Sequence, residues 1–406
     1  MTFASRRDDP LKVWELATGN PVWSLPNGGG INALRVDQTS RHLLTGSSDG
    51  CVRLWDLATG QPPWPPLRVG DAVHSVAFSA DGTRFATGAI EGEWWQGSAR
   101  VWETATGRAL TPALPHRDRV QGVEFSPNSR WLLTAGWDHR VRLWDATSGE
   151  LKRTFEGHGA RVEAALFSRD GKRVLSDGRE DGTARVWDVE TGQAVFPPLK
   201  HGGLVWTARF SSAEDRILTA SQDLTAAQWD ARTGKRIDPP LQHRGMVHEA
   251  TYGGSDRLIA TASADQSARL WSAANGELLA APFRHSGPVF FSRLTRDGLR
   301  LLTAGEDGKV QRWDLAVSDW PLADLRRYSE VLSCQSLQPD GRLQTLGPQE
   351  VAARMDALRA ARPRDFEVWP DELERWHRRE KIDSQRAGNP FAAGFHASRT
   401  SLPDFD

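Results

Sequence analysis

Short runs of alternating apolar and polar residues recur along most of this chain in a fixed order. Each unit comprises an apolar strand, a tight turn, a strand rich in Thr or Ser, a turn that contains Asp, and a strand that closes on tryptophan. In one unit these strands are expected over 120–125, 131–136 and 141–145, and a turn at 147–150 leads to a fourth. Alternation with a period of two predicts β-strands, and the Asp, Asn, Ser and Gly between them favour turns. The pattern therefore predicts four short strands per unit, with no long helix between them.

The closing tryptophans show how often the unit repeats. Successive spacings are 41, 47, 42, 43, 42, 42 and 42 residues along the series Trp14, Trp55, Trp102, Trp144, Trp187, Trp229, Trp271 and Trp313. A period in the low forties with four short strands per unit is typical of a β-propeller. We predict an all-β propeller of seven blades, each of four antiparallel strands, with an eight-bladed ring as the alternative.

An aspartate follows most of the closing tryptophans, and this pair carries a resemblance. The pair stands at Trp55, Trp144, Trp187, Trp229 and Trp313, whereas Glu103 and Ser272 take the place of the aspartate in two other units. With this recurring pair, the units from Leu11 to Asp314 resemble the WD40 repeat family. The resemblance implies a buried hydrogen-bond network in each blade, formed by a His before the first strand, a Ser or Thr on the second, an Asp in the next turn, and the Trp.

Five units contain residues at the positions of that network. The matching residues are His116, Thr134, Asp138 and Trp144; His158, Ser176, Asp181 and Trp187; His201, Asp223 and Trp229; His243, Asp265 and Trp271; and His285, Asp307 and Trp313. Units one and two lack the histidine, so their networks are expected to be incomplete. A Ser/Thr, a His and an Asp together could form a catalytic triad. Because the set recurs in blade after blade rather than once at a cleft, a structural role is favoured.

Composition and isolated motifs argue against several classes of function. The formal net charge is -1, which gives no reason to expect a nucleic-acid or membrane partner. Cys51 and Cys334 form no CxxC pair and the remaining histidines have no ligand spacing, so we expect no metal and no cofactor. Residues 46–50 match G-x-S-x-G but lie between two strands rather than before a helix. The sequence contains no apolar stretch typical of a signal peptide or a membrane span, and a cytoplasmic location is expected.

Both ends of the chain depart from the repeat. The chain begins inside a unit without a first strand, with a third strand expected over 11–16 and a fourth over Pro21–Leu25. In the WD40 family the N-terminal strand commonly completes the last blade, so this fourth strand is expected to close the ring beside unit seven. In the alternative, Leu337–Gly341 and the N-terminus build an eighth blade together. We predict a propeller domain over 1–320 and a helical tail over 321–406.

The tail has no repeat and carries a high density of charges of both signs. Residues 349–361 and 371–386 are expected to form solvated helices. The chain resembles long bacterial WD40 proteins, which are often linked to serine/threonine kinases and in which a helical-repeat region can follow the propeller. This resemblance implies that the tail is a remnant of such a region, and that the chain is a piece or a split relative of such a protein.

One rim of the ring is the best candidate for partner binding. Unit two has five extra residues between its second and third strands, and they bring Trp94 and Trp95 to a loop tip. Tryptophan is enriched in the energetic centres of protein interfaces, and loops on a rigid scaffold often carry binding groups. The same rim is expected to display the starts of the first strands, so the full set is Trp94, Trp95, Trp137, Trp206, His74, Gln121, Glu163, His248 and Phe290. Alternatively, Trp94 and Trp95 fold back onto the blade edge.

Three functions are compatible with these residues. The favoured one is a non-catalytic scaffold that binds a protein or peptide partner on the rim. The second is the detached regulatory or sensor half of a kinase-linked signalling protein. The third is an enzyme with its site at the central channel, for which Glu163 with His248 is the only candidate pair. Because no single convergent polar site stands out, we expect no enzymatic activity, although a fold alone does not fix a function.

Overall fold

The computed structural model describes residues 2–4, 10–15, 18–92, 96–295, 297–315, 330–331, 335–337 and 343–361. The chain divides into two compact units, Met1–Leu315 and Ala316–Asp406, which are considered separately below. Trp94, Trp95 and the helix predicted over 371–386 lie outside the described residues.

The first unit is built from repeated antiparallel sheets, and six of them have four strands. The first three are β4 (Ile31–Val36), β5 (His42–Ser47), β6 (Cys51–Asp56) and β7 (Leu67–Arg68); β8 (Ala72–Phe78), β9 (Arg84–Glu91), β10 (Gln96–Glu103) and β11 (Leu114–His116); and β12 (Val120–Phe125), β13 (Trp131–Gly136), β14 (Val141–Asp145) and β15 (Leu151–Phe155). The next three are β16 (Val162–Phe167), β17 (Arg173–Gly178), β18 (Thr183–Asp188) and β19 (Leu199–Lys200); β20 (Val205–Phe210), β21 (Arg216–Ser221), β22 (Thr225–Asp230) and β23 (Arg236–Gln242); and β24 (Val247–Gly253), β25 (Leu258–Ser263), β26 (Ser267–Ser272) and β27 (Phe283–Arg284).

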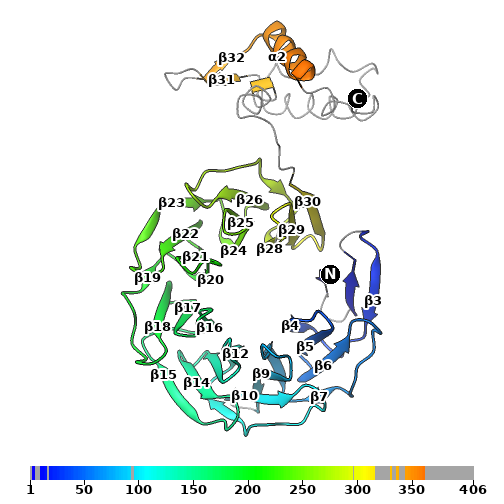
Figure 1. The fold of residues 1–406 in the computed structure, drawn as a ribbon, viewed down its shortest axis with the longest axis vertical. Helices are drawn as coiled ribbons and strands as arrows, with labels where there is room; N and C mark the ends of the chain where they lie inside the picture. Colours follow the sequence, from blue (N-terminus) through cyan, green and yellow to red (C-terminus); the bar gives the residue numbers. More distant parts are fainter. Residues whose placement is uncertain are drawn as a thin grey trace. The chain divides into compact units, whose positions relative to one another are not determined.

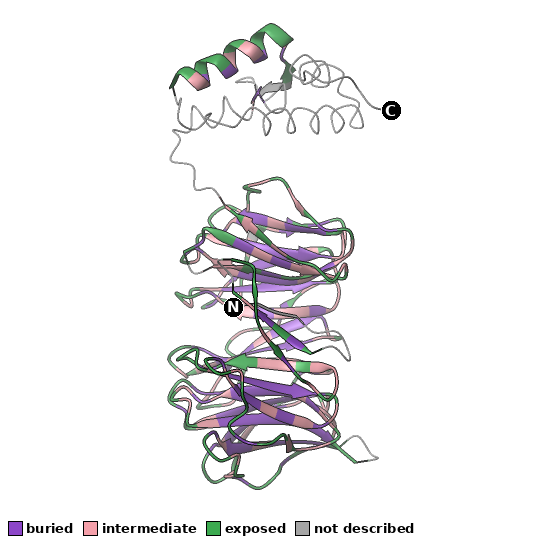
Figure 2. Ribbon diagram, turned by 90° about the vertical axis from the view of Figure 1, so that its right-hand side faces the viewer, coloured by how far each residue is buried: buried purple, intermediate pink, exposed green. Residues whose placement is uncertain are grey.

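These sheets are arranged as blades around a centre, with the first strand of each sheet innermost (Figure 1). Buried side chains are concentrated in the strands (Figure 2). The cores lie between neighbouring blades: Leu133 and Phe155 of one blade pack with Phe167 and Trp187 of the next. The prediction of an all-β propeller with repeated four-stranded antiparallel blades is therefore confirmed.

The aspartate that follows the closing tryptophan caps the turn into the fourth strand. Asp145 Oδ1 accepts hydrogen bonds from the backbone N–H groups of Thr147 and Ser148, each at 2.9 Å. The turn then reaches Gly149, whose φ of 75° is in the left-handed region that favours glycine. This local chemistry explains why an Asp after the Trp and a Gly four residues later recur along the sequence.

Closure of the ring differs from the prediction. β1 (Thr2–Ala4), β2 (Leu11–Trp14) and β3 (Pro21–Leu25) form a three-stranded sheet of their own. β3 pairs with β2, and among the described strands none pairs with the outer edge of β30, so the pairing of β3 with the seventh blade that we expected is not found there. Leu11, Val13 and Leu25 pack against Leu43 and Trp55, so this sheet stacks on the first complete blade as an eighth, partial one.

The seventh blade also has three strands, β28 (Val289–Leu294), β29 (Arg300–Gly305) and β30 (Val310–Asp314). No described residue adds a fourth strand to β30. Val310 is 39% exposed and Phe291 is 59% exposed, whereas Val141, the counterpart of Val310 in another blade, is fully buried. The described first unit therefore comprises six complete blades and two blades of three strands.

The second unit contains β31 (Gln335–Leu337), β32 (Leu343–Thr345) and the helix α2 (Pro348–Ala361). β31 pairs with β32 in antiparallel fashion, so the pairing found for Leu337 is within this unit rather than the eighth blade of the alternative prediction. Val351, Met355 and Leu358 are the buried residues of α2, at helical spacing. The C-terminal helix predicted over 349–361 is confirmed by α2.

Candidate functional site

The structure brings the five predicted network sets together. In the set around Trp144, the indole Nε1 donates to Thr134 Oγ1 at 2.8 Å, and His116 Nε2 lies 2.7 Å from the same hydroxyl. His116 Nδ1 lies 3.2 Å from Asp138 Oδ1. The other four sets show the same contacts, with Ser176, Thr219, Thr261 and Thr303 as the hydroxyl residues.

Each network joins two blades. His116 ends β11, the outer strand of one sheet, whereas Thr134 lies on β13 and Trp144 on β14 of the next. The network is therefore an inter-blade connection. The first two blades have a reduced version: Trp55 and Trp102 donate to Thr45 and Thr87 at 3.3 and 2.9 Å. In the first blade Arg53 Nη2 donates to Asp49 at 2.6 Å, as Arg142 at the corresponding position donates to Asp138 in the third.

The protonation states of the networks suit a structural role. Burial lowers the pKa values of His116, His201 and His243, although the neighbouring carboxylates oppose that effect, so these imidazoles are neutral near pH 7. Burial alone would raise the pKa of Asp223, but hydrogen bonds from Thr225, Gly202 N–H and His201 lower it to about 2. In these sets the imidazoles of His116, His201 and His243 are thus neutral, and the carboxylate of Asp223 is ionised, while both groups are already hydrogen-bonded within the network.

These pKa values predict that the fold loses stability in acid. The imidazoles with lowered pKa bind a proton more readily in the unfolded chain, so stability is expected to fall as the pH drops below about 6.5. The carboxylates of Asp138, Asp223 and Asp265, which also have lowered pKa values, add a steeper loss below about pH 4. The melting temperature measured from pH 8 to pH 3 tests this, and Asp223→Asn should show a weaker dependence on pH. A melting temperature that stays constant down to pH 3 contradicts it.

Six of the predicted rim residues share one backbone feature. The register of the first two strands shifts around each of them, as between Val120 and Gly122 or between Val205 and Thr207. Each is therefore the extra residue of a β-bulge, which leaves the sheet ladder and redirects its side chain. The six are His74, Gln121, Glu163, Trp206, His248 and Phe290, and Asn32 occupies the same place in the first complete blade.

Trp137 lies between two guanidinium groups. It stands in the turn between β13 and β14, and the Cζ atoms of Arg119 and Arg161 each lie 4.0 Å from its ring centroid. Cation–π contacts at this distance hold the half-buried indole in one orientation. Its Nε1 is buried and has no hydrogen-bond partner among the described residues. Arg119 Nε is also buried without a hydrogen-bond partner among the described residues, so this point of the rim has two donors without acceptors.

Trp206 begins a second group of stacked side chains. Arg179 lies over its ring at 4.2 Å, and Arg179 also donates to Glu163 at 3.0 Å. On the other side, the ring centroid of His248 lies 5.5 Å from Trp206 and 5.0 Å from Phe290. The Nε1 of Trp206 has no partner within the described chain. The predicted residues thus form a row that crosses the fifth, sixth and seventh blades.

His74 and Gln121 extend the rim into the second and third blades. Burial and then the charge of Arg119 lower the pKa of His74 to about 4, so its ring is neutral at pH 7. The His74 Nε2 and Gln121 Oε1 atoms are buried without a hydrogen-bond partner among the described residues. We call the rim arc the set of His74, Gln121, Trp137, Glu163, Trp206, His248 and Phe290, together with Arg119, Arg161 and Arg179. An unpaired buried polar group costs about 1–3 kcal/mol, so these buried atoms reduce the stability of the rim.

The arc does not have the geometry of a catalytic centre. Glu163 is paired with Arg179, and His248 packs against two aromatic rings, so the candidate acid–base pair is engaged elsewhere. The described residues contain no group of three or more His, Cys, Asp or Glu that could hold a metal ion. The arrangement instead offers aromatic faces, guanidinium groups and free hydrogen-bonding atoms, which are the features of a binding surface.

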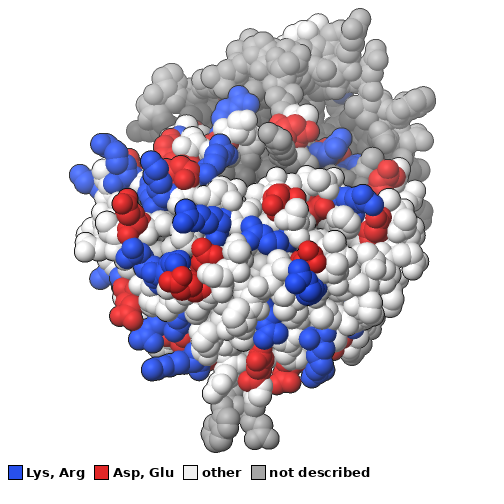
Figure 3. Space-filling view, turned by 60° about the horizontal axis from the view of Figure 1, so that its bottom comes forward, with Lys and Arg blue, Asp and Glu red and all other residues white. Residues whose placement is uncertain are grey.

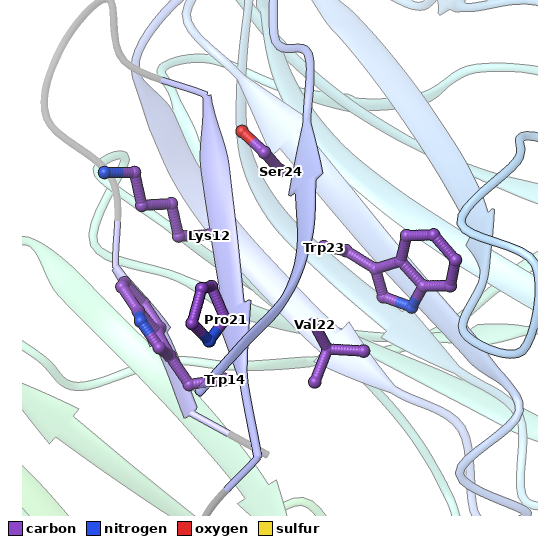
Figure 4. Close-up of a pocket in the computed structure, with 6 residues that line it drawn as sticks. All are labelled: Lys12, Trp14, Pro21, Val22, Trp23 and Ser24. Carbon is purple, nitrogen blue, oxygen red and sulfur yellow. The ribbon is translucent and has the colours of Figure 1, made fainter. Parts of the chain in front are cut away.

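Surface charge, a depression on the N-terminal sheet and the lengths of the described helices bear on other kinds of site. Figure 3 shows Lys and Arg interspersed with Asp and Glu over the face in view, rather than a patch of one sign. A depression of about 380 Å³ lies on β2 and β3 and is lined by Lys12, Trp14, Pro21, Val22, Trp23 and Ser24 (Figure 4). Lys12 is the one charged residue in this lining, so the depression does not bring several polar groups together. No helix in the described part of the chain is both long and apolar enough to span a membrane.

Sequence reasoning identified the bulged residues but missed the arginines that hold them. Arg119 and Arg161 were absent from the predicted set, because their relation to Trp137 depends on neighbouring blades. The repeat could have indicated these two arginines, because each is the residue directly before the first strand of its unit. Trp94 and Trp95 belong to the predicted set, and their place lies outside the described residues.

Comparison with known proteins shows similarity along the repeats. The family model "WD domain, G-beta repeat" matches residues 19–56, 65–103, 111–145 and 149–188. Short stretches are similar to plant proteins: 39% identity over 69 residues with THO complex subunit 6 of Arabidopsis thaliana, which is 17% of this chain and 18% of that protein. Small ribosomal subunit protein RACK1y of Oryza sativa subsp. japonica is 30% identical over 97 residues, which are 24% of this chain and 28% of that protein. The guanine nucleotide-binding protein subunit beta of Arabidopsis thaliana is 36% identical over 76 residues, which are 18% of this chain and 20% of that protein.

A solved structure extends the likeness to the whole ring. The computationally designed Ika8 protein superposes with a TM-score of 0.66 at 23% identity, covering 77% of this chain and 92% of that one. This identity supports the fold alone. The three relatives are eukaryotic and matched over a minor part of their length, so the resemblance to bacterial kinase-linked proteins gains no support from them.

Proposed function

We propose that this propeller, part of which matches the WD-domain repeat model, acts as a non-catalytic interaction scaffold whose rim arc binds a protein or peptide partner. WD40 domains generally bind proteins and are usually not catalytic. The observation that carries the proposal is the arc itself, in which bulged residues of six successive blades turn aromatic, imidazole and amide groups to one rim.

The chemistry of the arc indicates what the partner offers. Trp137 and Trp206 are half-buried aromatic side chains with guanidinium groups stacked on their rings, so this part of the arc combines aromatic surface with positive charge. Arg119 and Arg161 place positive charge beside one of these indoles. Phe290, which is 37% exposed at the other end, offers an apolar contact. A segment with acidic or carbonyl groups at one end and an apolar side chain at the other matches this order.

The names of the similar proteins agree with this proposal. A G-protein β subunit, a subunit of the THO complex and a small ribosomal subunit protein are each components of an assembly by name. The same scaffold could place its partner beside an enzyme or a membrane receptor, but no described residue favours one such context over another. The proposal is therefore limited to partner binding at the rim.

The test is affinity capture with the whole chain and with a Trp137→Ala, Trp206→Ala double variant, followed by direct binding measurements on the captured partner. Hot-spot tryptophans contribute about 2 kcal/mol or more each, so we expect the loss of either one to weaken binding about thirtyfold and the double variant to bind more weakly still. Leu279→Ala is the matched control, since Leu279 is 49% exposed but lies outside the arc. It should bind like the parent.

Two outcomes would contradict the proposal. The first is a partner whose affinity is equal for the parent and the double variant, provided that all three proteins have similar melting temperatures. The second is a partner that the Leu279→Ala control loses as well, because the binding surface would then lie outside the rim. A Trp94→Ala, Trp95→Ala variant in the same experiment tests whether the predicted loop belongs to the surface.

A further inference from the structure

Charged residues interrupt the repeat at one position of the innermost strands. This position precedes the aromatic or aliphatic residue near the end of each first strand, and in several blades it is small or apolar. From the first complete blade to the seventh it is occupied by Arg35, Ala77, Glu124, Leu166, Arg209, Thr251 and Arg293. Three arginines therefore stand on β4, β20 and β28, which are innermost in their sheets (Figure 1).

These arginines act on one another across the centre of the ring. Burial lowers the pKa of both Arg35 and Arg209, and the charge of Arg293 lowers both further, although for Arg35 the opposing charge of Glu124 has a larger effect than Arg293. β4, β20 and β28 are the innermost strands of the first, fifth and seventh blades. The centre of the ring is therefore where the long side chains of the three arginines can meet. We call Arg35, Arg209 and Arg293 the central arginine cluster.

Protein carboxylates neutralise the cluster only in part. Glu249 is shared, since its Oε1 contacts Arg293 Nη1 and lies 4.0 Å from Arg209 Nη2. Glu124 acts on Arg35 and Arg209, but burial raises its pKa to about 7, so it is about half ionised at neutral pH. Burial likewise raises the pKa of Asp177 to about 7. The three guanidinium groups thus lie near one carboxylate that two of them contact or approach, Glu249, and near two buried carboxylates whose pKa values are raised.

The cluster retains both access and free donors. The side chains of Arg209 and Arg293 are 41% and 47% exposed, whereas that of Glu249 is 5% exposed. Arg209 Nε has no hydrogen-bond partner among the described residues. A guanidinium group presents five donors in a planar fork that matches the oxygens of phosphate or carboxylate. Three such groups around one point provide charge and geometry for a compact anion.

We propose that the central arginine cluster binds a phosphate group, held between Arg35, Arg209 and Arg293 at the centre of the ring. Phosphate is favoured over a single carboxylate because it carries more charge and can accept from several forks at once. Repulsion among the arginines, which the carboxylates of the described residues offset only in part, would be relieved on binding. The site is separate from the rim arc in its residues, and the proposal stands whether or not the rim binds a protein.

The experiment measures binding of sodium tripolyphosphate to the full chain by calorimetry, at fixed ionic strength so that general screening is constant. We expect saturable binding of one molecule per chain and a raised melting temperature. Arg209→Gln and Arg293→Gln should each weaken the affinity about tenfold or more, as expected for the loss of charge-assisted hydrogen bonds. Arg68→Gln is the matched control, because Arg68 lies on the outer strand β7 with its side chain 67% exposed, and it should leave the affinity unchanged.

A second arm uses a phosphoserine peptide in place of tripolyphosphate. Binding of both ligands, or of the peptide alone, supports the site and tells whether a free phosphate compound or a phosphorylated segment is its source. Should Arg209→Gln fail to fold, Arg293→Lys keeps the charge, removes the fork and still predicts weaker binding. The proposal is overturned if neither ligand saturates, or if Arg68→Gln weakens binding as much as the cluster variants.

Discussion

Replacing Phe155 by alanine is expected to lower the free energy of unfolding by about 4 kcal/mol, which is the loss typical of a buried phenylalanine. Phe155 ends β15 and is fully buried between the third and fourth complete blades. Its ring centroid lies 5.9 Å from that of Trp187, and Val162 and Phe167 of the next blade belong to the same cluster. Alanine would leave a cavity that the strands on both sides cannot close, because hydrogen-bonded ladders hold them in place.

The repeat itself supplies the control for this prediction. Leu114, Leu199 and Leu241 occupy the corresponding place in other blades and are each at most 1% exposed. Phe155→Leu should therefore cost less than about 1.5 kcal/mol, as volume-conserving exchanges usually do. Urea unfolding of the three proteins, followed by tryptophan fluorescence, measures the difference. Equal stabilities of the alanine and leucine variants would show that this inter-blade core does not limit the fold.

The periodic part of the fold was predictable because one local solution is used repeatedly. A closing Trp, an Asp that caps the next turn and a Ser or Thr ten or eleven residues earlier are each fixed by contacts within a single blade or with its neighbour. Seven copies of the same pattern then specify the same strands seven times. A prediction from one copy is supported by all the others.

Ring closure was not predictable, because it depends on a contact that occurs only once. The sequence of Pro21–Leu25 suits a fourth strand, and both the seventh blade and its own sheet could accept it. The structure pairs it with β2, its neighbour along the chain, which requires only a short turn. Periodicity contains no information on this choice, since both partners present the same kind of edge.

The rim was predictable to the extent that it follows from position in the repeat. The six first-strand residues could be named from the sequence, but the bulges that direct them outward could not, because no residue type marks the bulge. The central arginine cluster was missed for the opposite reason. Its members depart from the repeat, and attention to Arg35, Arg209 and Arg293 as exceptions at one position would have indicated it.

The inter-blade networks also connect stability with the proposed binding surface. Asp138 follows Trp137 directly, so the carboxylate that joins two blades lies in the same turn as an indole of the rim arc. Asp138 Oδ2 accepts from Arg142 at 2.7 Å and from the backbone N–H of Arg117 at 3.1 Å. The position of Trp137 thus depends on a turn that Asp138 holds against the preceding blade.

Asp138→Ala is accordingly expected to cost about 3 kcal/mol, because it leaves the buried His116 and Arg142 without their anion. The same variant should weaken partner binding by releasing the turn that presents Trp137. Asp145→Ala is the control: Asp145 caps an exposed turn, and its loss should cost about 1 kcal/mol and leave binding unchanged. Thermal unfolding and partner affinity measured on both variants test whether Asp138 supports both the stability of the fold and the position of Trp137. If Asp138→Ala is as stable as Asp145→Ala, the networks do not join the blades; if it is unstable but binds normally, Trp137 is held by Arg119 and Arg161 alone.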